Sequence, residues 1–141
     1  MAAGRQWLAG ITAALALAAC SSLIYKPPPP PDPRLRPADY RRQIINLLPT
    51  ILDDVSAMRD TAITELALTD VDGVSLYTAC VRFNPRKSRT EYRGVQERFA
   101  IFHGGELAQF VPATAGQCAK AAWQPFPELA KHCVGDHCLK R

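Results

Sequence analysis

The feature that most constrains how this chain can fold is an uninterrupted run of prolines from Pro27 to Pro31. Proline fixes the backbone angle φ and has no N–H to donate, so the run favours an extended polyproline II rod over helix or central strand. Asp32-Pro33 and Arg36-Pro37 extend this composition to residue 37. We therefore expect a tether over residues 20–37, with one domain after it. The alternative to a simple spacer is a docking segment, because aromatic-lined grooves on partner proteins bind proline rods of this kind.

The segment before the tether has the three-part layout of a secretory signal peptide. Arg5 supplies a positive charge, Trp7 to Leu17 is an uncharged apolar run, and two small residues, Ala18 and Ala19, follow. As a helix, the apolar run is too short to cross a hydrocarbon core of ~30 Å. We therefore expect residues 1–19 to be removed from the mature protein.

The end of this segment, Leu17-Ala18-Ala19-Cys20, resembles the lipobox of bacterial lipoproteins. The resemblance implies that Cys20 receives a diacylglycerol, that cleavage precedes it, and that its new amine is acylated too. Two or more acyl chains anchor a protein firmly, because each buried methylene contributes ~0.8 kcal/mol. The alternatives are an ordinary signal peptide with a chance cysteine, or an uncleaved anchor.

Ser21 bears on which membrane would hold the anchor. In the best-known sorting systems, aspartate at this position retains a lipoprotein in the inner membrane, and its absence here resembles the outer-membrane class. The resemblance therefore implies the outer membrane rather than the inner one, with the domain in the periplasm. The proline tether would then hold the domain roughly 30 Å from the lipid surface.

Four cysteines remain once Cys20 is assigned to the lipid: Cys80, Cys118, Cys133 and Cys138. An even number in an oxidising compartment predicts two disulfides, with three possible connectivities. The sequence alone does not determine which of these connectivities forms. Cys133 and Cys138 are near neighbours and close a small loop easily, which would leave Cys80 and Cys118 to bridge a longer one.

The residues after the tether predict an amphipathic helix from about Asp39 to Arg59. Its apolar positions recur at three- and four-residue spacing. They are Tyr40, Ile44, Leu47, Leu48, Ile51, Leu52 and Val55. Pro49 falls inside this pattern, so we expect a kink or two short helices that meet near Leu48.

Four strands are predicted after the helix, because hydrophobicity there alternates with period two. They cover residues 62–69, 74–83, 92–102 and 106–111, with turns at 69–73 and at His103-Gly104-Gly105. The second is the clearest, with Tyr77, Ala79, Val81 and Phe83 on one face and Leu76, Thr78, Cys80 and Arg82 on the other. The predicted class is α+β, a helix packed on one face of a disulfide-stabilised antiparallel meander. The domain spans residues 38–130 and includes a short possible helix at 119–123.

The C-terminal tail, residues 131–141, offers a candidate metal site. Its donors are His132, Cys133, His137 and Cys138, which suit zinc or copper. Thiolates must stay reduced to bind metal, so a Cys133–Cys138 disulfide flanked by exposed histidines is the favoured interpretation. Neither this spacing nor any other motif predicts a cofactor.

A basic cluster in the loop between the second and third strands is the candidate site for an anionic ligand. It comprises Arg86, Lys87 and Arg89, joined by Arg82 and Arg93. Lipopolysaccharide, anionic lipid or an acidic protein surface would suit it. A solvated loop that protects a strand edge is the alternative. The net charge of +4 is too mild to argue for nucleic acid.

No residues predict catalysis. His103-Gly104-Gly105 is faintly similar to the oxyanion loop of lipases, but the Gly-x-Ser-x-Gly elbow is missing. Asp53-Asp54 and Asp70/Asp72 do not form a dyad that faces one cleft. We therefore expect a non-catalytic envelope lipoprotein that contacts another envelope protein or the cell wall. The alternative is a lipoprotein that binds a metal or an anionic ligand through the tail or the basic loop.

Overall fold

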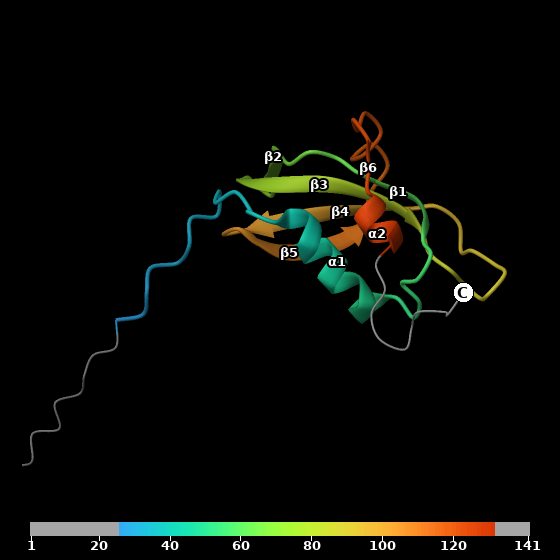
Figure 1. Cartoon of the computed structure of the whole chain (residues 1–141). Coiled ribbons are helices and arrows are strands. Elements are labelled where there is room, and N and C mark those ends of the chain that lie inside the picture. Colours follow the sequence, from blue (N-terminus) through green and yellow to red (C-terminus); the bar gives the residue numbers. More distant parts are fainter. Residues whose placement is uncertain (1–25, 132–141) are drawn as a thin grey trace, which may run out of the picture.

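The computed structural model describes residues 26–131. The candidate signal peptide, Cys20 and the cysteine- and histidine-containing tail from His132 onward lie outside these residues. The described elements are α1 (Tyr40–Ile51), β1 (Arg59–Ile63), β2 (Ala67–Val71), β3 (Val74–Asn84), β4 (Gln96–His103), β5 (Glu106–Pro112), β6 (Gln124–Pro125) and α2 (Pro127–Lys131). Helices and an antiparallel sheet make a mixed α+β fold, and the sheet is the larger component (Figure 1).

β3 is the central strand of this sheet. The strand order is β5-β4-β3-β1-β6, and β2 also pairs with β3. β4 runs along one side of β3, while β2 and β1 follow each other along the opposite side. The predicted alternation in β3 is confirmed, since Val81 and Phe83 join the core beneath the helices and Leu76 and Cys80 join a cluster on the other face.

The single strand predicted over residues 62–69 is wrong, because the chain breaks there into β1 and β2. Thr64 leaves the regular ladder: its N–H donates to Cys80 O, and its hydroxyl accepts from Cys80 N, both at 3.0 Å. The break changes the phase of the alternation. Ile63 and Leu66, expected on opposite faces, are therefore both buried in the core beneath the helices.

The predicted helix is also shorter than expected. α1 begins after Asp39, whose carboxylate accepts from Arg42 N, and it ends at Ile51 instead of Arg59. Pro49 lies in its last turn and supplies no N–H to the ladder, and Leu52 is already extended. Val55 and Met58 reach the core from the connection to β1.

Two further boundaries differ from the predictions. β4 begins at Gln96 rather than near Tyr92, which forms only an isolated bridge with Arg86. Residues 119–123 are turn and irregular backbone, and the second helix is α2, which starts with proline as first helical turns often do. The bond between Cys118 and Cys80 holds the 119–123 region as a loop over the sheet.

Both predicted hairpins are present, but their turns are shorter than expected, since Thr69 to Val71 belong to β2 and His103 to β4. Both two-residue turns have positive φ. Asp72 and Gly73 join β2 to β3 with φ of 52° and 82°, and Gly104 and Gly105 join β4 to β5 with φ of 61° and 84°. Two-residue turns of this kind match the twist of the strands that they connect.

The helices cover one face of the sheet (Figure 1). Ile44 and Leu48 of α1 and Leu129 of α2 are fully buried against it. Tyr40 meets Phe102 edge-to-face, with ring centroids 6.3 Å apart. The helix face is therefore an ordinary closed core.

The last residues of the expected tether pack on the domain. Gly104 N donates to Pro33 O at 3.3 Å, the guanidinium of Arg36 lies 5.5 Å from the ring centre of Tyr77, and Pro37 is buried. Residues 31–37 thus form a strap across the β4–β5 turn, which we call the proline strap. The extended chain before it projects away from the domain (Figure 1).

Replacing Gly104 should detach this strap. A Cβ at Gly104 would lie 2.8 Å from Pro31 Cγ, whereas a Cβ at Gly73 would meet nothing within 4 Å. Both Gly→Ala variants should lose about 1–2 kcal/mol of stability, because alanine disfavours positive φ. We expect only Gly104→Ala to speed hydrogen exchange at the Leu35 amide, which donates to Asp32 O. Equal exchange in the two variants would show that the strap does not depend on this contact.

Candidate functional site

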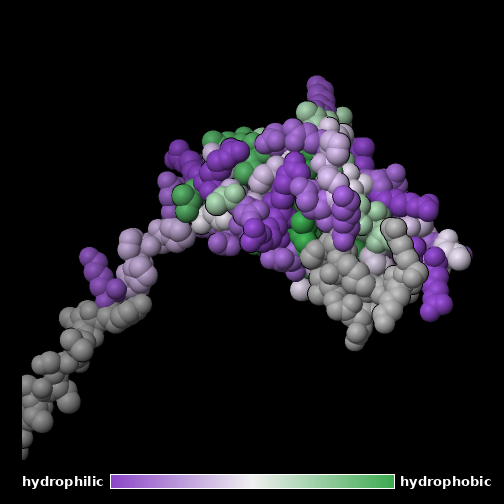
Figure 2. All heavy atoms as spheres, viewed as in Figure 1, coloured by the Kyte–Doolittle hydropathy of each residue, from purple (hydrophilic) through white to green (hydrophobic). Residues whose placement is uncertain are grey.

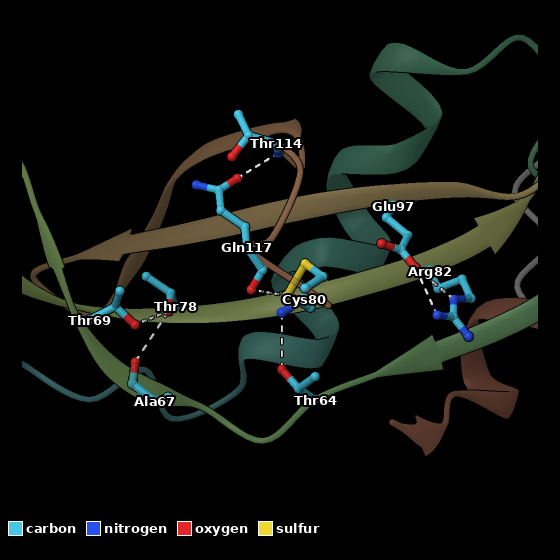
Figure 3. The surroundings of a disulfide bond; sticks show 10 residues. Thr64, Ala67, Thr69, Thr78, Cys80, Arg82, Glu97, Thr114 and Gln117 are labelled. Atoms are coloured by element: carbon cyan, nitrogen blue, oxygen red, sulfur yellow. Dashed lines mark hydrogen bonds and ion pairs between the residues drawn. A yellow bond between two sulfur atoms is a disulfide. The ribbon is translucent and has the colours of Figure 1, made fainter. Parts of the chain in front are cut away.

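The sheet face opposite α1 is covered by a loop that a disulfide holds in place. Cys80 in the middle of β3 bonds to Cys118 in the connection between β5 and β6, with Cα atoms 5.9 Å apart (Figure 3). Both cysteines are buried. The bond fixes residues 113–123, which have little regular secondary structure, against the central strand.

Hydrogen bonds set the shape of this disulfide-bonded loop. Gln117 Oε1 accepts from Thr114 N at 2.7 Å, and Ala113 N donates to Glu97 O at 3.0 Å (Figure 3). These contacts close the start of the loop on itself and on β4. The loop therefore has a defined position from which it can bound a binding site.

An ion pair and an aromatic ring fix the other end of the loop. Arg82 Nε and Nη2 both donate to Glu97 Oε1, at 3.1 and 2.7 Å. The same guanidinium lies 4.2 Å from the ring centre of Trp123. A cation held by a carboxylate beneath an aromatic ring is a favourable arrangement at a half-buried site. Arg82, which the sequence assigned to the basic cluster, is thus a structural residue of the sheet face.

A groove of about 960 Å³ lies between β2, the face of β3 and β4, and the disulfide-bonded loop. Its floor includes Cys80, Phe99 and Ile101, and alanines of the loop form one wall. Thr69 and Thr78 share a hydroxyl hydrogen bond of 2.7 Å across β2 and β3 beside it (Figure 3). The floor is apolar, so the groove can bind a hydrophobic group.

The rim of the groove is acidic. Glu65, Asp70 and Asp72 line it, against one cation, Lys120. Within residues 26–131, none of these three carboxylates takes part in an ion pair. The chain as a whole has a net charge of +4, so the negative charge of this rim is a local property of the groove.

The predicted basic cluster does not form one continuous basic surface. Lys87 pairs with Glu91 at 3.4 Å and Arg93 pairs with Asp53 at 3.3 Å, in addition to the Arg82–Glu97 pair described above. Arg89 is exposed on the loop. Neighbouring carboxylates thus offset most of the positive charge that the sequence places there.

Arg86, the remaining member of that cluster, lies with Arg59 against Tyr92. The guanidinium carbons are 5.8 and 4.3 Å from the ring centre, and the hydroxyl donates to Ala57 O at 3.1 Å. The Arg86 side chain beside the hydroxyl lowers the pKa of Tyr92, and the charge of Arg59 adds to the shift. Arg86 Nε is buried and has no hydrogen-bond partner among residues 26–131.

The other residues that the sequence singled out have structural contacts. Asp53 pairs with Arg93, and Asp54 accepts from the N–H and hydroxyl of Ser56. Asp70 accepts from Gly73 N in the β2–β3 turn. His103 is the last residue of β4, directly before the Gly104-Gly105 turn, and pairs with Glu106. Within residues 26–131, no group of three or more histidine, cysteine or acidic residues is placed to hold a metal ion.

Of the predicted site residues, the structure joins Cys80 and Cys118, while Cys20, Cys133 and Cys138 and the histidines His132 and His137 lie outside the described residues. The sequence did not reveal the groove. Its only signal was the Asp70/Asp72 pair beside Glu65, because the alanine-rich wall after Cys118 carries no motif.

No family model matches this chain, and comparisons with curated proteins and with solved structures found no match. Among the helices of residues 26–131, none has the length and apolar character needed to span a bilayer. The site must therefore be interpreted from its own chemistry.

Removing the disulfide should loosen the groove wall. We expect Cys80→Ala combined with Cys118→Ala to lower the free energy of unfolding by about 2–4 kcal/mol, because the unfolded chain gains freedom. Hydrogen exchange at Ala119 and Ala121 should speed more than at Ile63, which lies on the helix side of the sheet. Urea unfolding and exchange measurements check this, with reduced wild-type protein as the matched control. Unchanged stability and exchange would contradict the structural role of the bond.

Proposed function

We propose that this protein is a non-catalytic lipoprotein of the bacterial cell envelope. Lipid on Cys20 anchors it, the proline-rich segment sets its domain off from the bilayer, and the domain binds another envelope protein. The observation that carries the binding role is the apolar groove beside the disulfide, whose acidic rim takes part in no ion pair within residues 26–131.

The anchor rests on the order of sequence features. A positive N-terminus, an apolar run, Leu17-Ala18-Ala19-Cys20 and a proline-rich segment follow one another, as they do in bacterial lipoproteins. Ser21 favours the outer membrane over the inner one by the resemblance described above. Acylation anchors a protein domain to a membrane without a membrane-spanning helix.

The disulfide supports an extracytoplasmic location. Stable disulfides occur mainly in oxidising compartments such as the periplasm, because cytosolic thiols are kept reduced. Cys80 and Cys118 are buried and joined, and the bond secures the loop that bounds the groove. A domain whose binding site depends on this bond suits the periplasm.

A second candidate function is the binding of an anionic ligand by the loop after β3. The buried Nε of Arg86 favours it, since this atom has no hydrogen-bond partner in the described part of the chain. Arg59, which lies at the same Tyr92 ring, and the exposed Arg89 of the same loop add positive charge. The ion pairs of Lys87 and Arg93 weaken it, since an anion would compete with two carboxylates. Metal binding by His132, Cys133, His137 and Cys138 stays a separate proposal, which requires reduced thiols.

The anchor is tested by replacing the cysteine that would carry it. Cells fed labelled palmitate should label the wild-type chain and the Ser22→Ala control but not Cys20→Ser. Fractionation should place the labelled protein with the outer membrane. Intact mass of the mature protein should equal a chain that starts at Cys20 plus its acyl groups. A mass that matches an unmodified chain from Met1 would contradict the lipoprotein assignment.

The interaction role is tested by photo-crosslinking in intact cells. A photoreactive residue would replace Leu68, which is 54% exposed on the strand that borders the groove, or Val95, which is 55% exposed before β4. We expect adducts with an envelope protein from position 68 and not from position 95. Protein adducts only at position 95 would support an interaction role but would show that the binding surface is not the groove. Adducts at neither position would remove support for an interaction module.

A further inference from the structure

The two long edges of the sheet differ in how they are protected. At β5, the side chain of Gln43 donates to Gly105 O at 2.9 Å and accepts from Leu107 N at 2.6 Å. The pairing of β5 with β4 is irregular between Ile101 and Phe102, and the strand ends at Pro112. A side-chain clamp, a bulge and a proline are common ways to block a strand edge.

β2 has none of these features. Its sequence, Ala67 to Val71, contains neither lysine nor proline, and its register with β3 is regular from end to end. Within the described chain, β3 is its one partner in the sheet. Hydrophobic atoms gather in the region of β2 and β3 (Figure 2), where Leu68 and Val74 are the large exposed apolar residues. As far as residues 26–131 are concerned, the outer edge of β2 is therefore open to another strand.

The hairpin turn determines which backbone groups this edge offers. In a two-residue hairpin the flanking residues, here Val71 and Val74, form a hydrogen-bonded pair, and bonded pairs then alternate along the strands. Thr69 therefore bonds to β3, while Leu68 and Asp70 direct their N–H and C=O groups outward. An added strand would meet two donors and two acceptors at these residues.

The groove borders the same strand. Ala67, Thr69 and Val71 line it together with the acidic rim, so a strand added to β2 would extend one of its walls. On the groove side, alternate side chains of that strand would lie beside Ala67, Thr69 and Val71, at the edge of the groove. Others would lie close to Glu65, Asp70 and Asp72, where basic side chains fit best.

We propose that β2 binds an extended segment of another envelope protein, and that this segment carries alternating apolar and basic residues. This inference rests on the proposed interaction role. The segment adds to the sheet as an antiparallel or parallel strand. Its backbone bonds to Leu68 and Asp70, and its lysine or arginine side chains pair with the acidic rim.

Two other occupants fit less well. Pairing of β2 with β2 of a second copy would bring Asp70 and Asp72 of both chains to one ladder, where like charges repel. The chain's own Pro27 to Pro31 run lacks the N–H groups that a ladder needs.

The test uses the purified full mature chain and the synthetic peptide Lys-Val-Lys-Val-Lys-Val, followed by fluorescence anisotropy. A Glu-Val peptide of the same length should not bind. Asp70→Asn combined with Asp72→Asn should weaken lysine-peptide binding by about tenfold, since exposed charge pairs each contribute modestly. Glu106→Gln, an acidic-to-amide change at the other edge of the sheet, is the matched control and should leave binding unchanged.

Hydrogen exchange then locates the peptide. Binding should slow exchange at the Leu68 and Asp70 amides and leave Thr69 and Val71, already bonded to β3, unaffected. Peptides N-methylated on all valines or on all lysines should differ, because only one set of amides faces β2.

Equal binding of the two charge types, no binding of the lysine peptide, or protection elsewhere would overturn the proposal. A dimer that crosslinks to itself at position 68 would overturn it in favour of a second copy. If these tests fail while envelope-protein adducts still form in cells, the interaction role stands and only this mode of binding falls.

Discussion

The bond between Cys80 and Cys118 is the interaction on which the candidate site depends. It joins the centre of the middle strand to a loop that has little secondary structure of its own. α1 and α2 close the core on the opposite face. The loop therefore contributes more to the groove than to the core. Without a covalent link, residues 113–123 would have few buried apolar contacts to hold them over the sheet. The groove therefore exists because the disulfide holds this loop over the sheet face that the helices leave uncovered.

The part of the fold that could be predicted is the part set by local chemistry. The alternation in β3 follows from which side chains are apolar, and Asp72-Gly73 and Gly104-Gly105 follow from the need for positive φ. The α+β class follows from one helical pattern before several period-two patterns. These features need no knowledge of distant residues.

The errors arose where a distant contact decides the local structure. Thr64 breaks its strand because its hydroxyl bonds to Cys80 N, which lies on another strand. α1 stops at Ile51 although apolar residues continue to Val55, and Val55 instead reaches the core from the irregular connection between α1 and β1. The pairing of Arg82 with Glu97 and of Arg93 with Asp53 is likewise not visible within the sequence of the loop itself. No pattern within one segment carries that information, and the groove was missed for the same reason.

The proline strap has a mechanical consequence. Because Pro33 and Arg36 are held against the domain, the stiff proline run leaves it from a fixed point and in a fixed direction. If Cys20 carries the proposed lipid, the segment that joins the domain to its anchor includes this stiff proline run and is not flexible along its whole length. The proline run would then limit the directions in which the faces of the domain can point, and fewer orientations would have to be searched before a partner is met.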